Sequence, residues 1–431
     1  MWYSDGQVNS TAKPLYGFLL FLVVSLAARA FYIFMFSPIY SFDLSSWNRI
    51  ADILMAGGNP YHLTGWLNWP PIYMELLFVF KKLSLATHLP FNLIVQGFLI
   101  AVESALALLL FASIVRFSPS ANATRLLAIG IALNPVSILQ VCQHCNFDVL
   151  AGFWILLAVY LLLRFQERHE SGFWLLACFA LGMGTVTKTV PLCLAPLLLL
   201  SVRKLKLAEW FLGAVLLLGP VILAMSILYV LGPEDIQTKV FNYRAIPGCF
   251  GLHGLLAWWG ATRWCADYPR IFEIIYGSCW LCLGAWLWSR DSLDNRQFVS
   301  VSVVLLLAIP TLGPGYGPQY VYWFLPLLVL MYGLAERQVR VFLIILLGVA
   351  AATYLVEYAL FFNTNGSYLL NLVQTGKLLK FALRASPRRI RRCSVCRSGF
   401  STSFPWDISA WSLERRWSGM SEICGRGGLC R

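Results

Sequence analysis

The sequence predicts an all-α polytopic membrane protein, and three observations lead to that prediction. Hydrophobic residues make up 59% of the chain and charged residues 12%, whereas a soluble domain carries about a quarter charged residues. Apolar stretches recur along the chain, and many approach the roughly 20 residues that a helix needs to cross a bilayer. Short connections rich in Lys and Arg separate several of them, which is typical of cytoplasmic loops.

The apolar stretches predict about 11 transmembrane helices, with about 9 to 13 as the range, because several stretches are shorter than a full span. The first is too long for the apolar core of a signal peptide and no small-residue cleavage site follows it, so we expect it to remain as a helix. The windows cover residues 14–36, 92–115, 125–140, 148–164, 172–187, 189–201, 209–231, 271–289, 297–312, 320–335 and 340–362.

The positions of Lys and Arg predict which connections face the cytoplasm. The basic connections are residues 164–170, 201–206, 289–296 and 335–340. If successive windows cross the membrane in opposite directions and these connections lie in the cytoplasm, the N-terminus also lies in the cytoplasm. The same alternation places several polar segments outside, in the periplasm or an organelle lumen: residues 37–73, 140–148, 232–270 and 313–320.

Residues 69–90 form an apolar segment that is too short and too polar for a clear span. We interpret it as a surface or re-entrant helix on the outer side, because the next window then ends at Arg116 on the cytoplasmic side. The alternative is a true span with Lys81 and Lys82 inside. In that alternative, every later connection would lie on the opposite side of the membrane, unless one of the other windows does not cross it.

The first outer segment, residues 37–73, has the polar content of a reaction site at the membrane edge. Asp43 directly follows the first window, and polar residues up to Asp52 follow at helical spacing. Gly57 and Gly58 come next, and glycine readily takes the left-handed conformation that ends a helix. We therefore expect a short amphipathic surface helix, with Asp52 pointing to solvent.

The other outer segments contain further candidate site residues. His144, Asn146 and Asp148 lie within five residues at the start of a helix, where a cap would need only one of them. Lys188 lies at the outer membrane edge, where it either snorkels to the interface or awaits a phosphate. The guanidinium of Arg244 matches phosphate oxygens. Gln319 and Tyr320 enter the tenth window from a Gly-Pro-rich turn.

The net charge of +13 does not indicate nucleic-acid binding, because residues 377–431 contribute 12 Lys or Arg and 3 Asp or Glu. We assign residues 1–376 to the membrane domain and residues 377–431 to a basic tail. The tail is interpreted as disordered, including the case of an out-of-frame extension, or as a segment attracted to anionic lipid. Neither CxxC pair has a partner pair at zinc-site spacing, so no metal or cofactor is expected.

Several motifs, in this order, resemble the GT-C superfamily of integral membrane glycosyltransferases, which use polyprenyl-phosphate sugars. The resemblance covers residues 14–335 and is greatest to the mannosyltransferase-like branch. The WPPIY motif is reminiscent of the YPP segment of enzymes that depend on dolichyl-phosphate sugars. The similar features are Asp43 after the first helix, GGNPY at 57–61, WPPIY at 69–73, HCNFD at 144–148, KTVPLCLAP at 188–196 and PQYVYWFLP at 318–326.

The resemblance implies a hexosyltransferase in which Asp43 is the catalytic base. Phe42 stands where a second acid would be needed for a metal-binding pair, so the implied mechanism is metal-free inverting transfer. Hexose, with mannose favoured, would move from a polyprenyl- or dolichyl-phosphate sugar to a lipid-linked or glycan acceptor on the periplasmic or lumenal face. Lys188 and Arg244 would bind the donor phosphate. The expected substrate-binding residues are His144, Asn146, Asp148, Gln319 and Tyr320.

Two other functions compete with transfer. A lipid-linked sugar flippase or transporter would use the same lipid without chemistry, and an inert assembly subunit would lack activity. Transporters often contain two matching halves with broken helices in corresponding positions. The sequence shows no such repeat, and its polar residues gather in the outer segments, which favours the transferase. Bacterial inner membrane and endoplasmic reticulum both fit this expectation.

Overall fold

The computed structural model divides the chain into two units, residues 1–371 and 372–431. All the residues that the structure describes belong to the first unit. The predicted tail, residues 377–431, lies outside them, and so does Arg244. The described residues are 8–36, 41–64, 67–117, 134–200, 202–231, 237–241, 246–247, 251–259 and 262–357.

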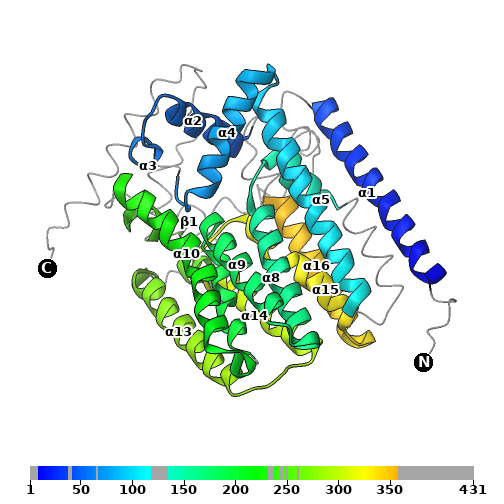
Figure 1. Cartoon of the computed structure of the whole chain (residues 1–431). Coiled ribbons are helices and arrows are strands. Elements are labelled where there is room, and N and C mark those ends of the chain that lie inside the picture. Colours follow the sequence, from blue (N-terminus) through cyan, green and yellow to red (C-terminus); the bar gives the residue numbers. More distant parts are fainter. Residues whose placement is uncertain are drawn as a thin grey trace, which may run out of the picture. The chain divides into compact units, whose positions relative to one another are not determined.

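The described part of the chain is helical apart from one antiparallel pair of two-residue strands, which confirms the predicted all-α class (Figure 1). The elements in chain order are α1 (Val8–Phe36), α2 (Phe42–Met55), α3 (Pro60–Leu63), α4 (Ile72–Thr87), α5 (Phe91–Phe117), α7 (Pro135–Ile138), η1 (Leu139–His144), α8 (Asp148–Arg168), α9 (Ser171–Thr187), η2 (Val190–Leu199), η3 (Val202–Lys204), α10 (Leu207–Leu231), η4 (Gln237–Phe241), β1 (Ile246–Pro247), α12 (Gly251–Trp258), α13 (Thr262–Trp288), α14 (Asn295–Leu312), β2 (Gly315–Tyr316), η5 (Pro318–Tyr320), α15 (Val321–Leu334) and α16 (Arg337–Glu357).

Among the described residues, six helices are long and apolar enough to cross a membrane: α5, α8, α10, α13, α14 and α16. Shorter apolar helical stretches lie in α1, α9, η2 and α15. This pattern is compatible with an integral membrane protein. The predicted total of about 11 spans stays a prediction, partly because most of the window at 125–140 lies outside the described residues.

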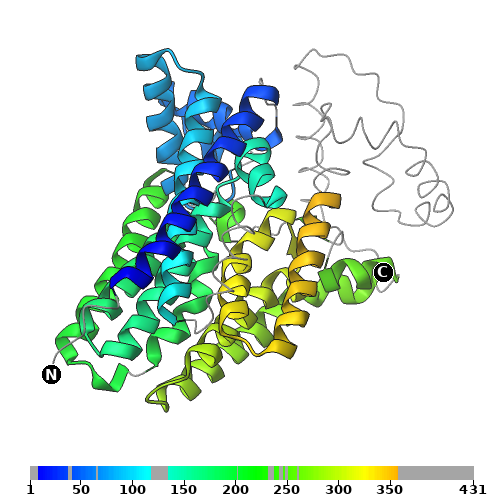
Figure 2. The same cartoon turned by 90° about the vertical axis from the view of Figure 1, so that its right-hand side faces the viewer.

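The described part of residues 37–73 contains the short helix and the glycine helix end that its local sequence predicts. The Ser41 hydroxyl caps α2 by accepting a hydrogen bond from the Leu44 amide at 3.0 Å. The helix ends before Gly57, whose φ of 75° is the left-handed conformation expected of glycine. The 16-residue α4 packs against α2 and α5 and is shorter than a typical span. Figures 1 and 2 show α2 and α4 together at one end of the bundle.

Connections predicted to share a side of the membrane contact one another. On the predicted cytoplasmic side, Arg116 binds Glu167, and the Leu293 amide donates to the Gln166 side chain at 3.0 Å. On the predicted outer side, Lys239 donates to the Thr64 carbonyl at 3.4 Å. The helix contacts thus agree with the grouping that the charge pattern predicts, although they do not identify the compartment.

A buried ion pair joins α1 to the bundle. Arg29 and Glu103, whose side chains are 1% and 4% exposed, form a bond of 2.6 Å between Nε and Oε2. Tyr322 donates to Glu103 at 2.9 Å, and Arg29 donates to the Ser137 hydroxyl at 2.6 Å. Figure 2 shows α1, in dark blue, lying across one face of the bundle. Tyr32 of α1 also donates to the Gln143 side chain at 2.9 Å, so α1 has polar attachments at two positions.

Removing one member of this pair should destabilise the protein. We expect Glu103→Ala to cost about 3–5 kcal/mol, because it leaves the Arg29 charge buried without its counter-ion. Thermal unfolding in detergent measures the loss. The double variant Arg29→Leu with Glu103→Leu should recover most of the stability. Glu167→Ala, which breaks an exposed pair, is the control and should change little; equal stability of Glu103→Ala and wild type would contradict the assignment.

The grouping of connections also predicts the membrane topology. An epitope inserted between Gly57 and Gly58 should lie on the opposite side from one inserted between His169 and Glu170, because the basic connections remain in the cytoplasm. A third epitope after Asp291 should share the side of the His169 epitope. Antibody access in intact and permeabilised cells measures this. The first two epitopes appearing on one side would refute the arrangement.

Candidate functional site

The candidate site is built on a segment of irregular backbone that we call the junction, residues 139–148. Its first part is the π-helix η1, and Cys145 follows in the left-handed conformation with φ of 57°. A non-glycine residue at positive φ is uncommon and persists where the surroundings hold it. The Asn146 amide donates to the Gln140 carbonyl at 3.2 Å and so closes the turn. α8 begins two residues later, at Asp148.

Side chains from neighbouring helices satisfy the junction carbonyls that this irregular backbone leaves unpaired. Each donor comes from a different place in the sequence, and together they attach the start of α2, its middle and α5 to the junction. The bonds are Ser41 to the His144 carbonyl at 3.1 Å, Trp47 to the Cys145 carbonyl at 2.9 Å, and Gln96 to the Cys142 carbonyl at 2.7 Å. The junction therefore determines where α2 presents its first turn.

That first turn carries Asp43, whose side chain is 19% exposed. Oδ2 of Asp43 accepts from Asn146 Nδ2 at 2.7 Å and lies 2.9 Å from His144 Nε2. Because a carboxylate oxygen accepts, the His144 ring donates to Asp43 in the tautomer that carries the proton on Nε2. Both bonds use the same oxygen. Oδ1 of Asp43 has no hydrogen-bond partner among the described residues, so it is free to accept a proton from a substrate.

The second ring nitrogen of His144 faces Tyr354 of α16. The distance between Nδ1 and the Tyr354 hydroxyl is 3.3 Å, and Tyr354 is fully buried. In neutral His144, Nδ1 accepts from that hydroxyl, which orients the ring toward Asp43. Sequence reasoning missed Tyr354, because it occupies an apolar window and no local signal distinguishes it from a core tyrosine.

A second carboxylate, Asp148, is fully buried and pairs with Lys188. The distance between Lys188 Nζ and Asp148 Oδ1 is 2.5 Å, and their side chains are 17% and 0% exposed. The indole of Trp323 donates to the same oxygen. Oδ2 of Asp148 has no hydrogen-bond partner among the described residues. The sequence allowed two roles for Lys188, snorkelling and phosphate binding. In the structure, Lys188 is the counter-ion of the buried Asp148.

Aromatic rings surround the Lys188 ammonium. Its Nζ lies 5.2 Å from the ring centroids of Phe147, Tyr320 and Trp323. Tyr320 stacks on Trp323 with centroids 3.9 Å apart. Cation–π attraction to these rings holds the ammonium in place.

Asn146 connects the Asp43 carboxylate to the backbone of Asp148. Its Nδ2 donates to Asp43, while its Oδ1 accepts from the Asp148 amide at 2.9 Å. The structure thus brings most of the predicted site residues into one network, which contains Asp43, His144, Asn146, Asp148, Lys188 and Tyr320. Gln319 is not part of it: its amide lies against Gly317, and no hydrogen bond to Asp43 or Lys188 is found. Arg244 lies outside the described residues.

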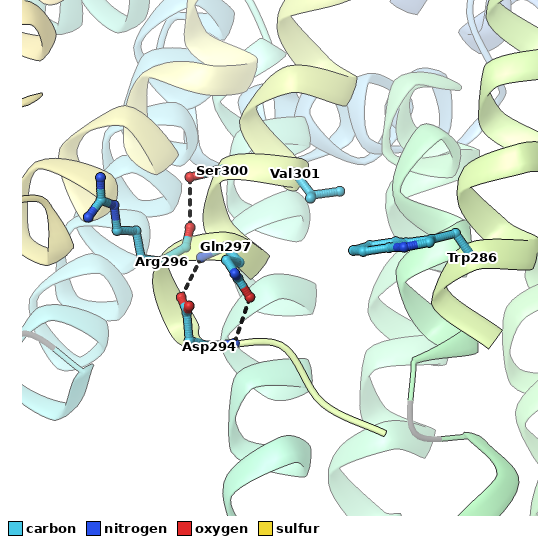
Figure 3. Close-up of a pocket in the computed structure, with 6 residues that line it drawn as sticks. All are labelled: Trp286, Asp294, Arg296, Gln297, Ser300 and Val301. Carbon is cyan, nitrogen blue, oxygen red and sulfur yellow. Dashed lines mark hydrogen bonds between the residues drawn. The ribbon is translucent and has the colours of Figure 1, made fainter. Parts of the chain in front are cut away.

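A pocket of about 470 Å³ lies elsewhere, near the start of α14 (Figure 3). Its polar residues already have local partners: Asp294 and Gln297 form a capping box, and Arg296 binds Glu336 at 2.6 Å. None of the predicted site residues lines it. Trp286, Asp294, Arg296, Gln297, Ser300 and Val301 line the pocket. We interpret it as a surface hollow between helix ends.

The Asp148–Lys188 pair predicts a stability effect that snorkelling does not. Lys188→Met should cost about 3–5 kcal/mol, because it leaves the Asp148 carboxylate buried without a counter-ion. Adding Asp148→Asn should restore much of the loss. Thermal unfolding in detergent measures both variants. Lys81→Met, which removes a lysine paired with the exposed Asp52, is the matched control and should have a small effect; an equally small effect of Lys188→Met would support snorkelling.

Comparison with known proteins adds no assignment. No protein-family model matches the chain, and no curated protein matches it either. Any functional assignment therefore rests on the motifs in the sequence and on the geometry of this network.

Proposed function

We propose that the protein is a membrane glycosyltransferase of the GT-C type. It would transfer a hexose, with mannose favoured, from a polyprenyl- or dolichyl-phosphate sugar to a hydroxyl of a lipid-linked or glycan acceptor. The observation that carries this proposal is the Asp43 carboxylate. Asp43 is partly exposed, contacts Asn146 and His144 through one oxygen, and is connected to Lys188 through Asn146 and then Asp148.

In the proposed reaction, Asp43 acts as general base. Its Oδ1 takes the proton from the acceptor hydroxyl while the acceptor oxygen attacks the anomeric carbon. The new glycosidic bond forms on the face opposite the phosphate, the bond from the anomeric carbon to the phosphate oxygen breaks, and polyprenyl phosphate leaves with its electron pair. One displacement inverts the anomeric configuration. His144 and Asn146 keep the carboxylate oriented throughout.

The leaving phosphate needs neutralisation of charge more than a proton. The Lys188 ammonium has three N–H donors, and the bond to Asp148 uses one of them. The others would donate to phosphate oxygens, since the Lys188 side chain is 17% exposed. Arg244 is proposed as the second phosphate-binding cation, on the basis of the sequence alone. The Asp148 carboxylate offsets the lysine charge, so Lys188 would act mainly through directed hydrogen bonds.

The orientation proposed here follows the charge pattern. With about 11 spans and the basic connections in the cytoplasm, Asp43 faces the periplasm or the lumen of the endoplasmic reticulum. A polyprenyl-phosphate sugar presents its headgroup at that surface while its chain stays in the bilayer. Membrane lipids and the two glycan substrates are then the partners.

Replacing Asp43 tests the proposal most directly. We expect Asp43→Asn to lower the turnover number about 100-fold or more, which is the usual contribution of a general base. The fold should survive, because the carbonyl oxygen of Asn can accept both bonds that now reach Oδ2. Membranes containing each variant are incubated with radiolabelled dolichyl-phosphate mannose and dolichyl-phosphate glucose, and labelled glycolipid and glycoprotein are separated.

Asp52→Asn is the control, since Asp52 lies on the same helix but pairs with Lys81 at an exposed position. It should transfer sugar at the wild-type rate. Near-normal transfer by Asp43→Asn would place the base elsewhere. Movement of the labelled lipid across the bilayer, without any new glycosidic bond in wild type, would instead identify a transporter.

A further inference from the structure

Buried polar atoms without a partner gather at the site. In the described part of the chain, the buried side-chain nitrogens and oxygens that form no hydrogen bond belong to Trp69, Tyr73, Gln140, Asp148, Arg164 and Gln166. Folded proteins pair almost all such atoms, so an unpaired group needs a physical explanation. The first four residues lie in the junction or in the WPPIY segment beside it. Ligand or water can supply the missing partners there.

Two of these residues pack against the ring of Phe147, and a third follows Phe147 in the chain. Tyr73 stacks on Phe147 with centroids 4.2 Å apart, and Trp69 lies 5.2 Å from it. Asp148 is the next residue in the chain. The unpaired atoms on these residues are the Tyr73 hydroxyl, Nε1 of Trp69 and Oδ2 of Asp148. The Phe147 ring also lies 5.2 Å from Nζ of Lys188, which binds Asp148.

The chemistry of these atoms selects one class of ligand. The Trp69 indole is a donor only, which disfavours a metal cation. The carboxylate oxygen of Asp148 can only accept hydrogen bonds, which disfavours an anionic ligand because such a ligand also only accepts. A hydroxyl group satisfies both, since it accepts from Trp69 or Tyr73 and donates to Asp148. Burial raises the pKa of Tyr73, so its hydroxyl remains protonated and able to donate.

We propose that Trp69, Tyr73 and Oδ2 of Asp148 form a subsite for hydroxyl groups of the transferred sugar. This inference rests on the proposed glycosyl transfer and identifies residues that bind the sugar ring instead of the phosphate. Aromatic walls with a few directed polar groups are typical of small-molecule sites.

Two neighbouring tyrosines provide a matched test. Tyr61 and Tyr73 are both buried, at 1% and 0% exposure. The Tyr61 hydroxyl donates to the Trp69 carbonyl at 2.6 Å, whereas that of Tyr73 has no partner among the described residues. Tyr61→Phe should therefore lower the melting temperature in detergent. Tyr73→Phe should leave it unchanged or raise it, because the substitution removes only a buried unpaired hydroxyl.

The binding experiment uses full-length protein and three lipids: dolichyl-phosphate mannose, dolichyl-phosphate glucose and dolichyl phosphate. We expect Tyr73→Phe to bind the preferred sugar-bearing lipid about 2- to 12-fold more weakly than wild type, the range for one neutral hydrogen bond. Its affinity for dolichyl phosphate should not change, because the phosphate does not reach this subsite.

Two results would overturn the subsite. One is an unchanged affinity of Tyr73→Phe for the sugar-bearing lipids that wild type binds. The other is a loss of melting temperature equal to that of Tyr61→Phe, which would mean that a structural water holds the Tyr73 hydroxyl. Failure of the wild-type protein to bind any of the sugar-bearing lipids would refute the proposed transferase function itself, and the subsite with it.

Discussion

The arrangement of the site depends on the backbone hydrogen bonds of the junction, residues 139–148. Irregular backbone within a membrane protein is tolerated only where protein or a water-filled cavity satisfies its polar groups. Here the carbonyls of Cys142, His144 and Cys145 are satisfied by side chains from α5 and from the start and middle of α2. This single segment therefore holds α2 and α5 in fixed positions relative to one another. The position of Asp43 follows from that constraint.

Two buried ion pairs have different surroundings and different consequences. Glu103 accepts hydrogen bonds from Arg29 and Tyr322, and among the described residues neither of its oxygens is left unpaired. Asp148, in contrast, keeps one oxygen unpaired while its partner Lys188 remains partly exposed. A complete buried network contributes rigidity, whereas an incomplete one is costly unless a ligand or water completes it. Because of this difference, we propose a substrate-binding role for Asp148 and a purely structural role for the Arg29–Glu103 pair.

The residues of the network differ in exposure. The side chains of Asp43 and Lys188 are 19% and 17% exposed. Asp148, Trp323 and Tyr73 are buried at the inner side of the same group. Asn146 donates to the Asp43 carboxylate and accepts from the Asp148 backbone amide, so it holds Asp43 against the start of α8.

Short-range features were determined by the sequence itself. The all-helical class, the glycine end of α2 and the apolar windows depend on composition and neighbouring residues, so they were predictable. The pairs were not: Asn146 and Asp43 are 103 residues apart, Arg29 and Glu103 are 74 apart, and Lys188 and Asp148 are 40 apart. Which side chains meet depends on which helices become neighbours, and apolar periodicity is much the same for every choice of neighbour. Only tertiary packing could turn an isolated lysine at the membrane edge into the counter-ion of a buried acid.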